Sequence, residues 1–282
     1  MKVIDRIRHT INFPVVWFAT EPVRKSGIIT YHEAEFEAKG ANEFITLVND
    51  ITGTDDEIKA CFSKSCKYKV NRAEREAVEI RLLKNEEITD DIIDEFLDFF
   101  KTFWESKDTV WDDRESVRRD LVDFREVGAL SIGIGLVNGQ KAIYHTHIFD
   151  DNRARLLHSA SLYRLENDEE GNTRNIIGMA NRYLHYKEML FFRDLGLKKY
   201  DWGGAGRGED VINITEFKES FGGYTKTYYD FEVTKGIKAH IFKALVNIMD
   251  DSLKGFTYIG KPVIIGIPMY DISKYIGILY YD

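Results

Sequence analysis

Apolar residues recur along this chain at two spacings, one typical of helices and one typical of strands, and the two alternate. The clearest helical spacing runs through residues 88–105, where Ile92 and Phe96 fall on one face. Thr89 directly precedes that face and is a suitable cap for the first turn. The pattern predicts helices at 54–79, 88–105, 114–125, 175–195, around Phe217 and at 238–252, and strands at 15–19, 28–38, 78–83, 129–137, 140–149, 153–163, 199–202 and 224–233.

The predicted order from residue 86 to 233 is helix, helix, three antiparallel strands, long helix, strand, helix, strand. Asn138-Gly139 joins the first two of the three strands and is the strongest short hairpin signal in the chain. Gly196 follows the long helix at the position where a glycine commonly ends a helix. Because no internal repeat or low-complexity linker interrupts this order, we expect a main α/β domain at 86–282 and, packed on it, a partial α/β extension at 1–85.

The stretch from Lys198 to Gly223 places a short strand, a glycine-rich turn and a helix within a few residues of each other. Glycine has no Cβ, so such a turn lets a backbone approach another group closely. Open α/β proteins place their chemistry at such strand ends. We therefore expect a binding cleft here, and a basic side chain from the helix, Lys218, that reaches it. The residues of this stretch expected to bind substrate are Trp202, Gly203, Gly204, Arg207 and Phe217.

Histidines concentrate on two of the predicted strands. His145 and His147 are two residues apart and so point to one face of their strand, and His158 lies on the next strand. Three neighbouring histidines can be hydrogen-bonded interior groups, supply a general base or bind a metal. No carboxylate or cysteine on the same strands completes a ligand set, so no metal site is predicted.

The long predicted helix carries a polar face. Asn181, His185 and Glu188 are spaced i, i+4, i+7 and therefore share that face, which looks either into the cleft or into solvent. Asp201, at the end of its strand, either orients a base or an amine, or caps the glycine turn. Our site hypothesis has Lys218, His147 and Asp201 as catalytic residues, with His145, Asn181 and His185 added to the substrate-binding set.

Composition and charge narrow the function. The net charge is −8, the first 85 residues are near neutral and no basic face is evident, which argues against a DNA-binding protein. Cys61 and Cys66 form no zinc-binding set and are expected to be free thiols. No apolar run suits a signal peptide or a membrane span, so we expect a cytoplasmic protein without membrane insertion. No nucleophile-elbow or P-loop motif is present.

The run YDWGG at 200–204, followed by FKESFGG at 217–223, resembles the signature near the end of the Fem-type (FemAB-like) peptidoglycan aminoacyltransferases and their acyltransferase relatives. The segment KYKVNRAEREAVEI at 67–80 and the long helix add to the resemblance, which covers residues 65–233. It implies a GNAT-like acyltransferase fold: a mixed, mostly antiparallel central sheet with flanking helices, plus a partial N-terminal GNAT-like extension.

The resemblance also implies an activity. Family members transfer an acyl or aminoacyl group from a thioester or an aminoacyl-tRNA to an amine on a cell-envelope precursor or a related small molecule. The family's Phe-Lys pair corresponds to Phe217-Lys218, which makes Lys218 the expected charge partner of the reaction's oxyanion. A histidine, Asp201 or water would accept the proton from the amine.

The chain departs from the family in ways that decide the expected donor. The peptidoglycan-building members have two complete GNAT-like domains, and some have a coiled-coil arm, whereas here only a partial first domain is available. We therefore expect an N-acyltransferase that acts on an amine of a cell-envelope or amino-sugar precursor. Its donor would be acyl-CoA or an acyl-carrier-protein thioester, with no tightly bound cofactor.

Two alternatives remain open. One is an aminoacyl-tRNA-dependent aminoacyltransferase. The other is a catalytically silent GNAT-like binding module, because the segment Arg164–Arg174 lacks the Arg/Gln-x-x-Gly-x-Gly/Ala loop that acetyl-CoA enzymes use. The silent module predicts an exposed Lys218. The oligomeric state is left open, and the tail from Phe256 is expected to be extended.

Overall fold

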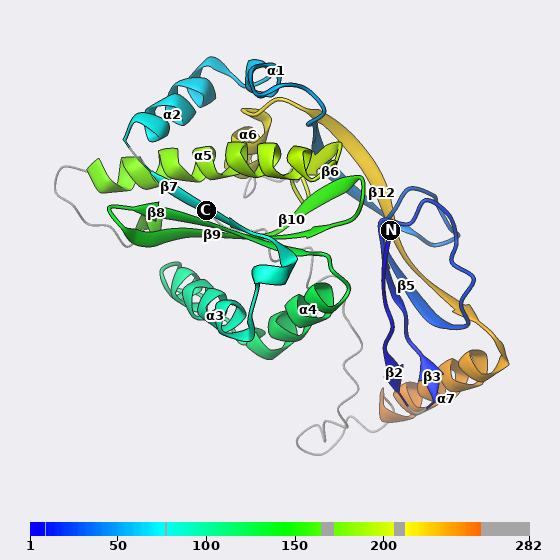
Figure 1. Cartoon of the computed structure of the whole chain (residues 1–282). Helices are drawn as coiled ribbons and strands as arrows, with labels where there is room; N and C mark the ends of the chain where they lie inside the picture. The colour runs from blue at the N-terminus through cyan, green and yellow to red at the C-terminus, as the bar shows by residue number, and fades with distance from the viewer. Residues whose placement is uncertain (9, 77, 165–171, 206–211, 255–282) are drawn as a thin grey trace. The chain divides into compact units, whose positions relative to one another are not determined.

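The computed structural model describes residues 1–254 except 9, 77, 165–171 and 206–211 (Figure 1). The predicted tail from Phe256 and the predicted substrate-binding residue Arg207 therefore lie outside the described residues. The chain divides into two compact units. Unit 1 comprises Val3–Phe44 and the described residues from Tyr228 on, and unit 2 comprises Ile45–Thr227. This grouping differs from the expected domain boundary at residue 85, which stays a prediction.

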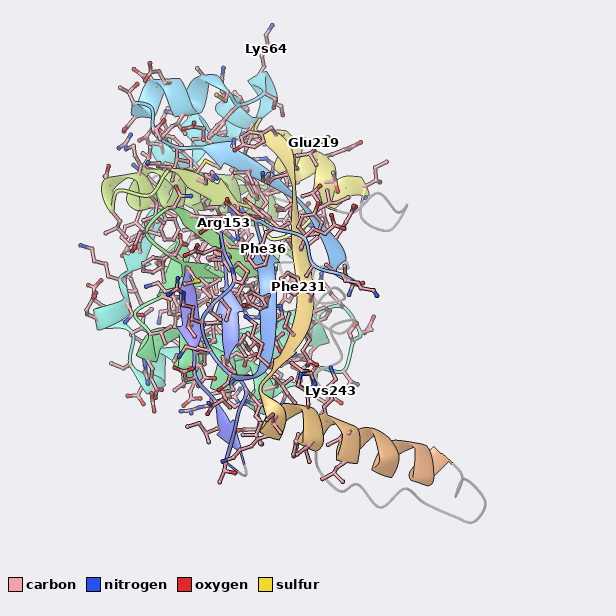
Figure 2. All side chains as sticks on the ribbon, turned by 90° about the vertical axis from the view of Figure 1, so that its right-hand side faces the viewer. Phe36, Lys64, Arg153, Glu219, Phe231 and Lys243 are labelled. Atoms are coloured by element: carbon pink, nitrogen blue, oxygen red, sulfur yellow. The ribbon has the colours of Figure 1, made fainter. Side chains whose placement is uncertain are left out.

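Unit 1 is built on a small sheet with one long helix. Tyr31 and Phe231 stack with ring centroids 4.7 Å apart. Phe36, which is labelled beside Phe231 in Figure 2, meets it edge-on at 5.5 Å. On its surface Lys243 pairs with Glu232. Its elements are β1 (Lys2–Ile4), β4 (Val15–Trp17), β5 (Gly27–Ala34) and β12 (Tyr224–Lys235) in hydrogen-bonded order, a separate hairpin of β2 (Ile7–Arg8) and β3 (Ile11–Asn12), and α7 (Ile237–Lys254).

Unit 2 contains the predicted three-stranded meander and extends it on both sides. Asn138 and Gly139 have φ values of 53° and 77°, the left-handed conformation that a tight hairpin turn requires. All neighbouring strands are antiparallel except β10 and β11, which run parallel. In spatial order the strands are β6 (Asn42–Asp50), β11 (Lys199–Asp201), β10 (Arg153–Ser161), β9 (Gln140–Phe149), β8 (Leu130–Val137) and β7 (Glu79–Leu83).

Helices cover both faces of this sheet (Figure 1). The helix α5 lies along one face with α2 against it, and α3 and α4 lie on the other. The elements are α1 (Asp55–Ala60), α2 (Lys64–Arg75), η1 (Asn85–Glu87), α3 (Asp90–Glu105), α4 (Arg114–Glu126), η2 (Leu162–Arg164), α5 (Asn172–Asp194) and α6 (Ile212–Glu219). The mixed, mostly antiparallel sheet with flanking helices confirms the expected GNAT-like fold class.

The capping residues set where the helices of unit 2 begin. Thr89 accepts a hydrogen bond from the backbone N–H of Ile92, as expected for α3. The helix predicted at 54–79 is instead two helices, because Ser63 caps a second one, α2. Cys61 is exposed and Cys66 is buried, and neither is in a disulfide. In the described part of the chain, no helix is long and apolar enough to cross a membrane.

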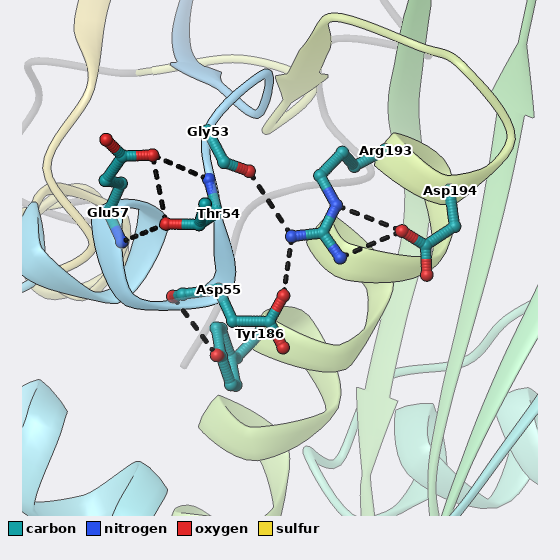
Figure 3. Close-up of polar contacts among 7 residues, drawn as sticks. All are labelled: Gly53, Thr54, Asp55, Glu57, Tyr186, Arg193 and Asp194. Carbon is teal, nitrogen blue, oxygen red and sulfur yellow. Dashed lines mark hydrogen bonds and ion pairs between the residues drawn. The ribbon is translucent and has the colours of Figure 1, made fainter.

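The start of α1 is fastened to the end of α5 (Figure 3). Thr54 and Glu57 form a reciprocal capping box, in which the Glu57 carboxylate accepts from the Thr54 N–H at 2.8 Å. The Arg193 guanidinium donates to the Asp55 carboxylate at 2.6 Å and to the Gly53 carbonyl at 3.3 Å. These contacts hold the loop after β6 against α5. They help to position β6 and α5, which both carry residues of the candidate site described below.

Candidate functional site

The glycine turn follows β11, as the sequence predicts. Gly203 and Gly204 have φ values of 69° and 117°, which side-chain-bearing residues rarely adopt. A Cβ at Gly203 would lie 2.2 Å from the Leu156 carbonyl oxygen. The glycine is therefore needed for close approach, and the group that it approaches is the neighbouring strand β10.

At this turn β10 and β11 stop pairing. Their last paired residues are Arg155 and Asp201, although β10 continues to Ser161. On the other side, the Trp202 and Ala205 N–H groups still bond to β6 carbonyls. The turn therefore stays hydrogen-bonded to β6, whereas β10 diverges from it. It lies at the point where the parallel strands β10 and β11 separate.

Asp201 caps this turn. It is completely buried, and its Oδ1 accepts hydrogen bonds from the Gly203 N–H at 2.9 Å and from the Thr46 hydroxyl at 2.6 Å. Its Oδ2 accepts from the Arg153 guanidinium at 3.1 Å. The Thr46 hydroxyl oxygen in turn accepts from the Gly204 N–H at 3.0 Å. Of the two roles considered for Asp201, the structure shows the capping one; its catalytic role stays a prediction.

The side chain of Lys218, on α6, contacts the same turn through backbone carbonyls. Its side chain is 4% exposed, and its Nζ donates to the carbonyl oxygens of Trp202 at 3.1 Å and Gly204 at 2.6 Å. Burial lowers the pKa of Lys218 to about 7; the nearby Arg155 lowers it further and Asp201 partly offsets both. An ammonium has three N–H donors, and among the described residues the third has no acceptor. We call Thr46, Arg153, Asp201 and Lys218 the turn cluster.

The position of α6 is fixed by an asparagine that sequence reasoning did not single out. Asn49 on β6 accepts from the Trp202 indole N–H at 2.8 Å and donates to the Phe221 carbonyl at 2.9 Å. Phe217 is partly buried, with the Arg182 guanidinium 4.5 Å from its ring centroid. Trp202, Phe217 and Lys218 are thus held around one turn, as the sequence motif predicts.

A second buried cluster joins the strand histidines to the polar face of α5. His145 places Nδ1 2.8 Å from a Glu188 carboxylate oxygen and Nε2 2.9 Å from the Asn181 side-chain oxygen. The Tyr200 hydroxyl donates to the other Glu188 oxygen at 2.8 Å. It also lies 2.8 Å from His185 Nδ1. We call His145, His147, His185, Glu188 and Tyr200 the histidine cluster; each member is 0–1% exposed.

Burial governs the charges in this cluster. It lowers the pKa of His147 to about 4 and the pKa of His185 to about 3, so both imidazoles are neutral at physiological pH. Burial alone would raise the pKa of Glu188, but the adjacent His145 and His147 outweigh it and hold that pKa well below its usual value. The Glu188 carboxyl group is therefore ionised at physiological pH.

His158 does not join the other strand histidines. A register shift in β10 places His158 opposite Thr146, and the Thr146 hydroxyl is 2.7 Å from His158 Nδ1. Its ring packs against Phe96 and Phe100 of α3, on the face of the sheet away from α5. Burial lowers the pKa of His158 to about 3. The expected trio of strand histidines is thus split by a bulge that the sequence did not reveal.

The structure sorts the predicted site residues into two groups. Those at the turn are Asp201, Trp202, Gly203, Gly204, Phe217 and Lys218; those in or beside the histidine cluster are His145, His147, Asn181 and His185. In the second group His145, His147 and His185 are at most 1% exposed, and Asn181 is partly exposed. Their predicted contacts with substrate stay predictions. Sequence reasoning missed Thr46, Asn49, Arg153 and Arg155, which sit on strands and carry no motif.

Comparisons with known proteins give a fold. No protein-family model matches the chain, and no curated protein matches its sequence. The crystal structure of FemX superposes with a TM-score of 0.54 at 14% identity, covering 72% of this chain and 63% of that one. This chain shares its fold with FemX. The predicted resemblance to the Fem-type and GNAT-like superfamily is confirmed at the level of the fold.

A further solved structure is the C-terminal domain (DUF2156) of a putative lysylphosphatidylglycerol synthetase from Agrobacterium fabrum. It superposes with a TM-score of 0.49 at 12% identity, covering 89% of this chain and 84% of that one. The present chain spans less than two thirds of the length of FemX. The activity therefore has to be argued from the site.

Proposed function

We propose that this protein is an N-acyltransferase whose transfer centre is the glycine turn after β11, with Lys218 as its charged group. The observation that carries the proposal is the buried Lys218 ammonium, which is directed at the turn by the Trp202 and Gly204 carbonyls. Arg155 lies close enough to lower the pKa of Lys218, so positive charge exceeds negative charge around the turn. Such a site suits a developing oxyanion.

The chemistry uses few groups. A neutral acceptor amine attacks the donor carbonyl, and a C–N bond forms as the carbonyl electrons move onto oxygen. Lys218 donates its remaining N–H to that oxyanion. The C–S or C–O bond to the leaving group then breaks, and the proton lost by the amine passes to the leaving group or to solvent. Trp202, Phe217 and the two glycines position the acyl group against Lys218.

The burial of Lys218 argues against a catalytically silent module. In such a module Lys218 would have no catalytic role, and its side chain is expected to be exposed. The side chain is 4% exposed, and holding a lysine in that position is costly because burial disfavours the ammonium. A cost of this kind is common at functional sites.

The donor divides the proposal into two forms. Our first form uses an acyl-CoA or acyl-carrier-protein thioester and an amine of an amino-sugar or cell-envelope precursor. The second uses aminoacyl-tRNA, and two observations favour it: the fold is shared with FemX, and the sequence at 164–174 lacks the pyrophosphate-binding pattern of acetyl-CoA enzymes.

The test is a transfer assay with both classes of donor. The wild-type protein is incubated with labelled acyl-CoA, acyl-carrier protein or aminoacyl-tRNA and a panel of amines, and amide formation is measured. We expect Lys218→Met to lower kcat about 10²–10³-fold, the usual effect of removing one oxyanion donor. Lys101→Met is the matched control, because Lys101 is exposed on α3 and pairs only loosely with Glu105 at 3.7 Å.

The outcomes separate the alternatives. Turnover with CoA or carrier-protein thioesters supports the first form, and turnover with aminoacyl-tRNA alone supports the second. If a folded Lys218→Met protein keeps full activity with either donor, Lys218 is not in the transfer centre. If the wild-type protein binds none of the donors, the silent module becomes the better description.

A further inference from the structure

Glu188 is a buried carboxylate whose ion-pair partners in the described part of the chain are all imidazoles. His145 Nδ1, His185 Nδ1 and His147 Nε2 lie 2.8, 3.3 and 3.5 Å from its oxygens. The Glu188 side chain is 1% exposed. A carboxylate and imidazoles held together away from water form a donor set of the kind that divalent transition-metal ions favour.

Three of these groups have the arrangement of a metal-ligand set. One nitrogen of His145, one of His185 and a Glu188 oxygen all lie within 4.8 Å of one another. Ligands bonded to zinc at ~2.0–2.1 Å in a tetrahedron lie roughly 3.3–3.4 Å apart. His145 Nδ1 lies 2.8 Å from Glu188 Oε1 and His185 Nδ1 lies 3.3 Å from Glu188 Oε2, so each nitrogen is near this separation from one oxygen of the carboxylate.

We propose that His145, His185 and Glu188 bind a divalent transition-metal ion, with zinc the best fit to two imidazoles and one carboxylate. The role is structural, because the ligands are buried and the ion would tie α5 to β9 in the interior of unit 2. The inference is independent of the proposed acyl transfer, since Lys218 and the glycine turn take no part in it.

The surroundings of the ligands support this assignment. Asn181 holds His145 Nε2 at 2.9 Å, which directs Nδ1 toward the site, as outer hydrogen bonds do for metal-bound histidines. The Tyr200 hydroxyl lies 2.8 Å from both His185 Nδ1 and Glu188 Oε2, so it borders two of the three ligands. Trp202 and Phe217 pack on His185 and keep the site apolar.

The ligands also come from rigid elements. His185 and Glu188 are three residues apart on α5 and so lie on one face of the helix, and His145 lies in the middle of the strand β9. Because each ligand is at most 1% exposed, an ion would enter as the chain folds. Loading is therefore tested during refolding.

The alternative is that these side chains only hydrogen-bond to one another, as His145 does to Glu188 and Asn181. The experiment refolds the full chain, carrying Cys61→Ser to remove an exposed thiol, in excess Co²⁺ and then dialyses it. We expect one cobalt per chain by elemental analysis and the intense visible absorption of tetrahedral Co²⁺. Zn²⁺ present during refolding should also raise the melting temperature.

Two variants decide the assignment. Glu188→Gln keeps the shape and hydrogen-bonding capacity of the side chain and should lose the cobalt signal, whereas His158→Gln, outside the cluster, should keep it. If Glu188→Gln does not fold, His185→Gln is used in the same way. The proposal is overturned if the wild-type protein refolds equally well without metal and binds no cobalt.

Discussion

The turn cluster and the histidine cluster lie side by side in the interior of unit 2, and their polar groups find hydrogen-bond partners in different ways. In the histidine cluster, the polar contacts are mostly between side chains: Tyr200 and His145 donate to the same carboxylate of Glu188, although His147 Nδ1 has no partner among the described residues. In the turn cluster, one carboxylate, Asp201, is shared among Arg153, Thr46 and a backbone N–H, and within the described part of the chain Lys218 bonds to backbone carbonyls only.

This difference supports the proposal that the turn cluster performs the chemistry. The histidine cluster joins α5 to β9 through buried side chains and so stabilises the fold, as would the metal ion that we propose for it. The turn cluster combines backbone carbonyls, excess positive charge and a glycine turn where two strands part, and so keeps a donor available. Buried polar groups therefore do not identify an active site by themselves.

We expect the largest effect on stability from a substitution in the histidine cluster. Glu188→Leu removes the carboxylate but leaves His145, His185 and Tyr200 buried without their acceptor. We expect a loss of about 3–5 kcal/mol in the free energy of unfolding, the usual cost of removing one partner of a buried pair. Chemical denaturation measures it. A loss below 1 kcal/mol would show that the cluster contributes no more than a surface pair.

The turn cluster should respond to pH through Lys218. Its folded pKa of about 7 lies below the ordinary value of 10.5, so between these values the unfolded chain binds more protons and stability rises with pH. Lys218→Met removes this dependence. The stability of the wild type relative to Lys218→Met should increase by about 2–3 kcal/mol from pH 6 to pH 9. A constant difference across that range would mean that the lysine titrates normally.

The sequence predicted the turn cluster better than the histidine cluster for a physical reason. Glycines, a strand end and a lysine one helix later lie within a short stretch, so local pattern was enough to place Lys218 beside Gly204. The histidine cluster depends on the register of β9 against α5, which no local pattern specifies. Glu188 was recognised on a polar helix face, but its burial was not foreseen.

The elements of the fold divide in the same way, into those that local sequence predicts and those that depend on long-range contacts. Thr89, the Asn138-Gly139 hairpin and the helix end at Gly196 follow from local chemistry and were predicted correctly. The strand β6 was missed, because its burial changes from exposed to buried along its length instead of alternating, and its pairing with β11 is a long-range contact. The same strand carries Thr46 and Asn49, and so both of these site residues were missed with it.

A smaller effect is expected at the turn itself. Gly203→Ala places a methyl group against the Leu156 carbonyl at a positive φ, and we expect a loss of about 2 kcal/mol. Gly139→Ala is the matched control: its φ is also positive, but nothing lies within 4 Å of the added Cβ, so it reports backbone strain alone. Equal losses in urea denaturation would show that close approach to β10 is not what Gly203 provides.

The smallest effect tests whether the turn cluster positions Lys218. Thr46→Val keeps the shape of the side chain but removes both the donor to Asp201 and the acceptor of the Gly204 N–H, and should cost about 1–2 kcal/mol of stability. Because the Gly204 carbonyl holds Lys218, kcat should also fall, whereas Thr46→Ser should restore both stability and kcat. If stability falls with kcat unchanged, the turn tolerates displacement, and Lys218 is held mainly by the Trp202 carbonyl and by α6.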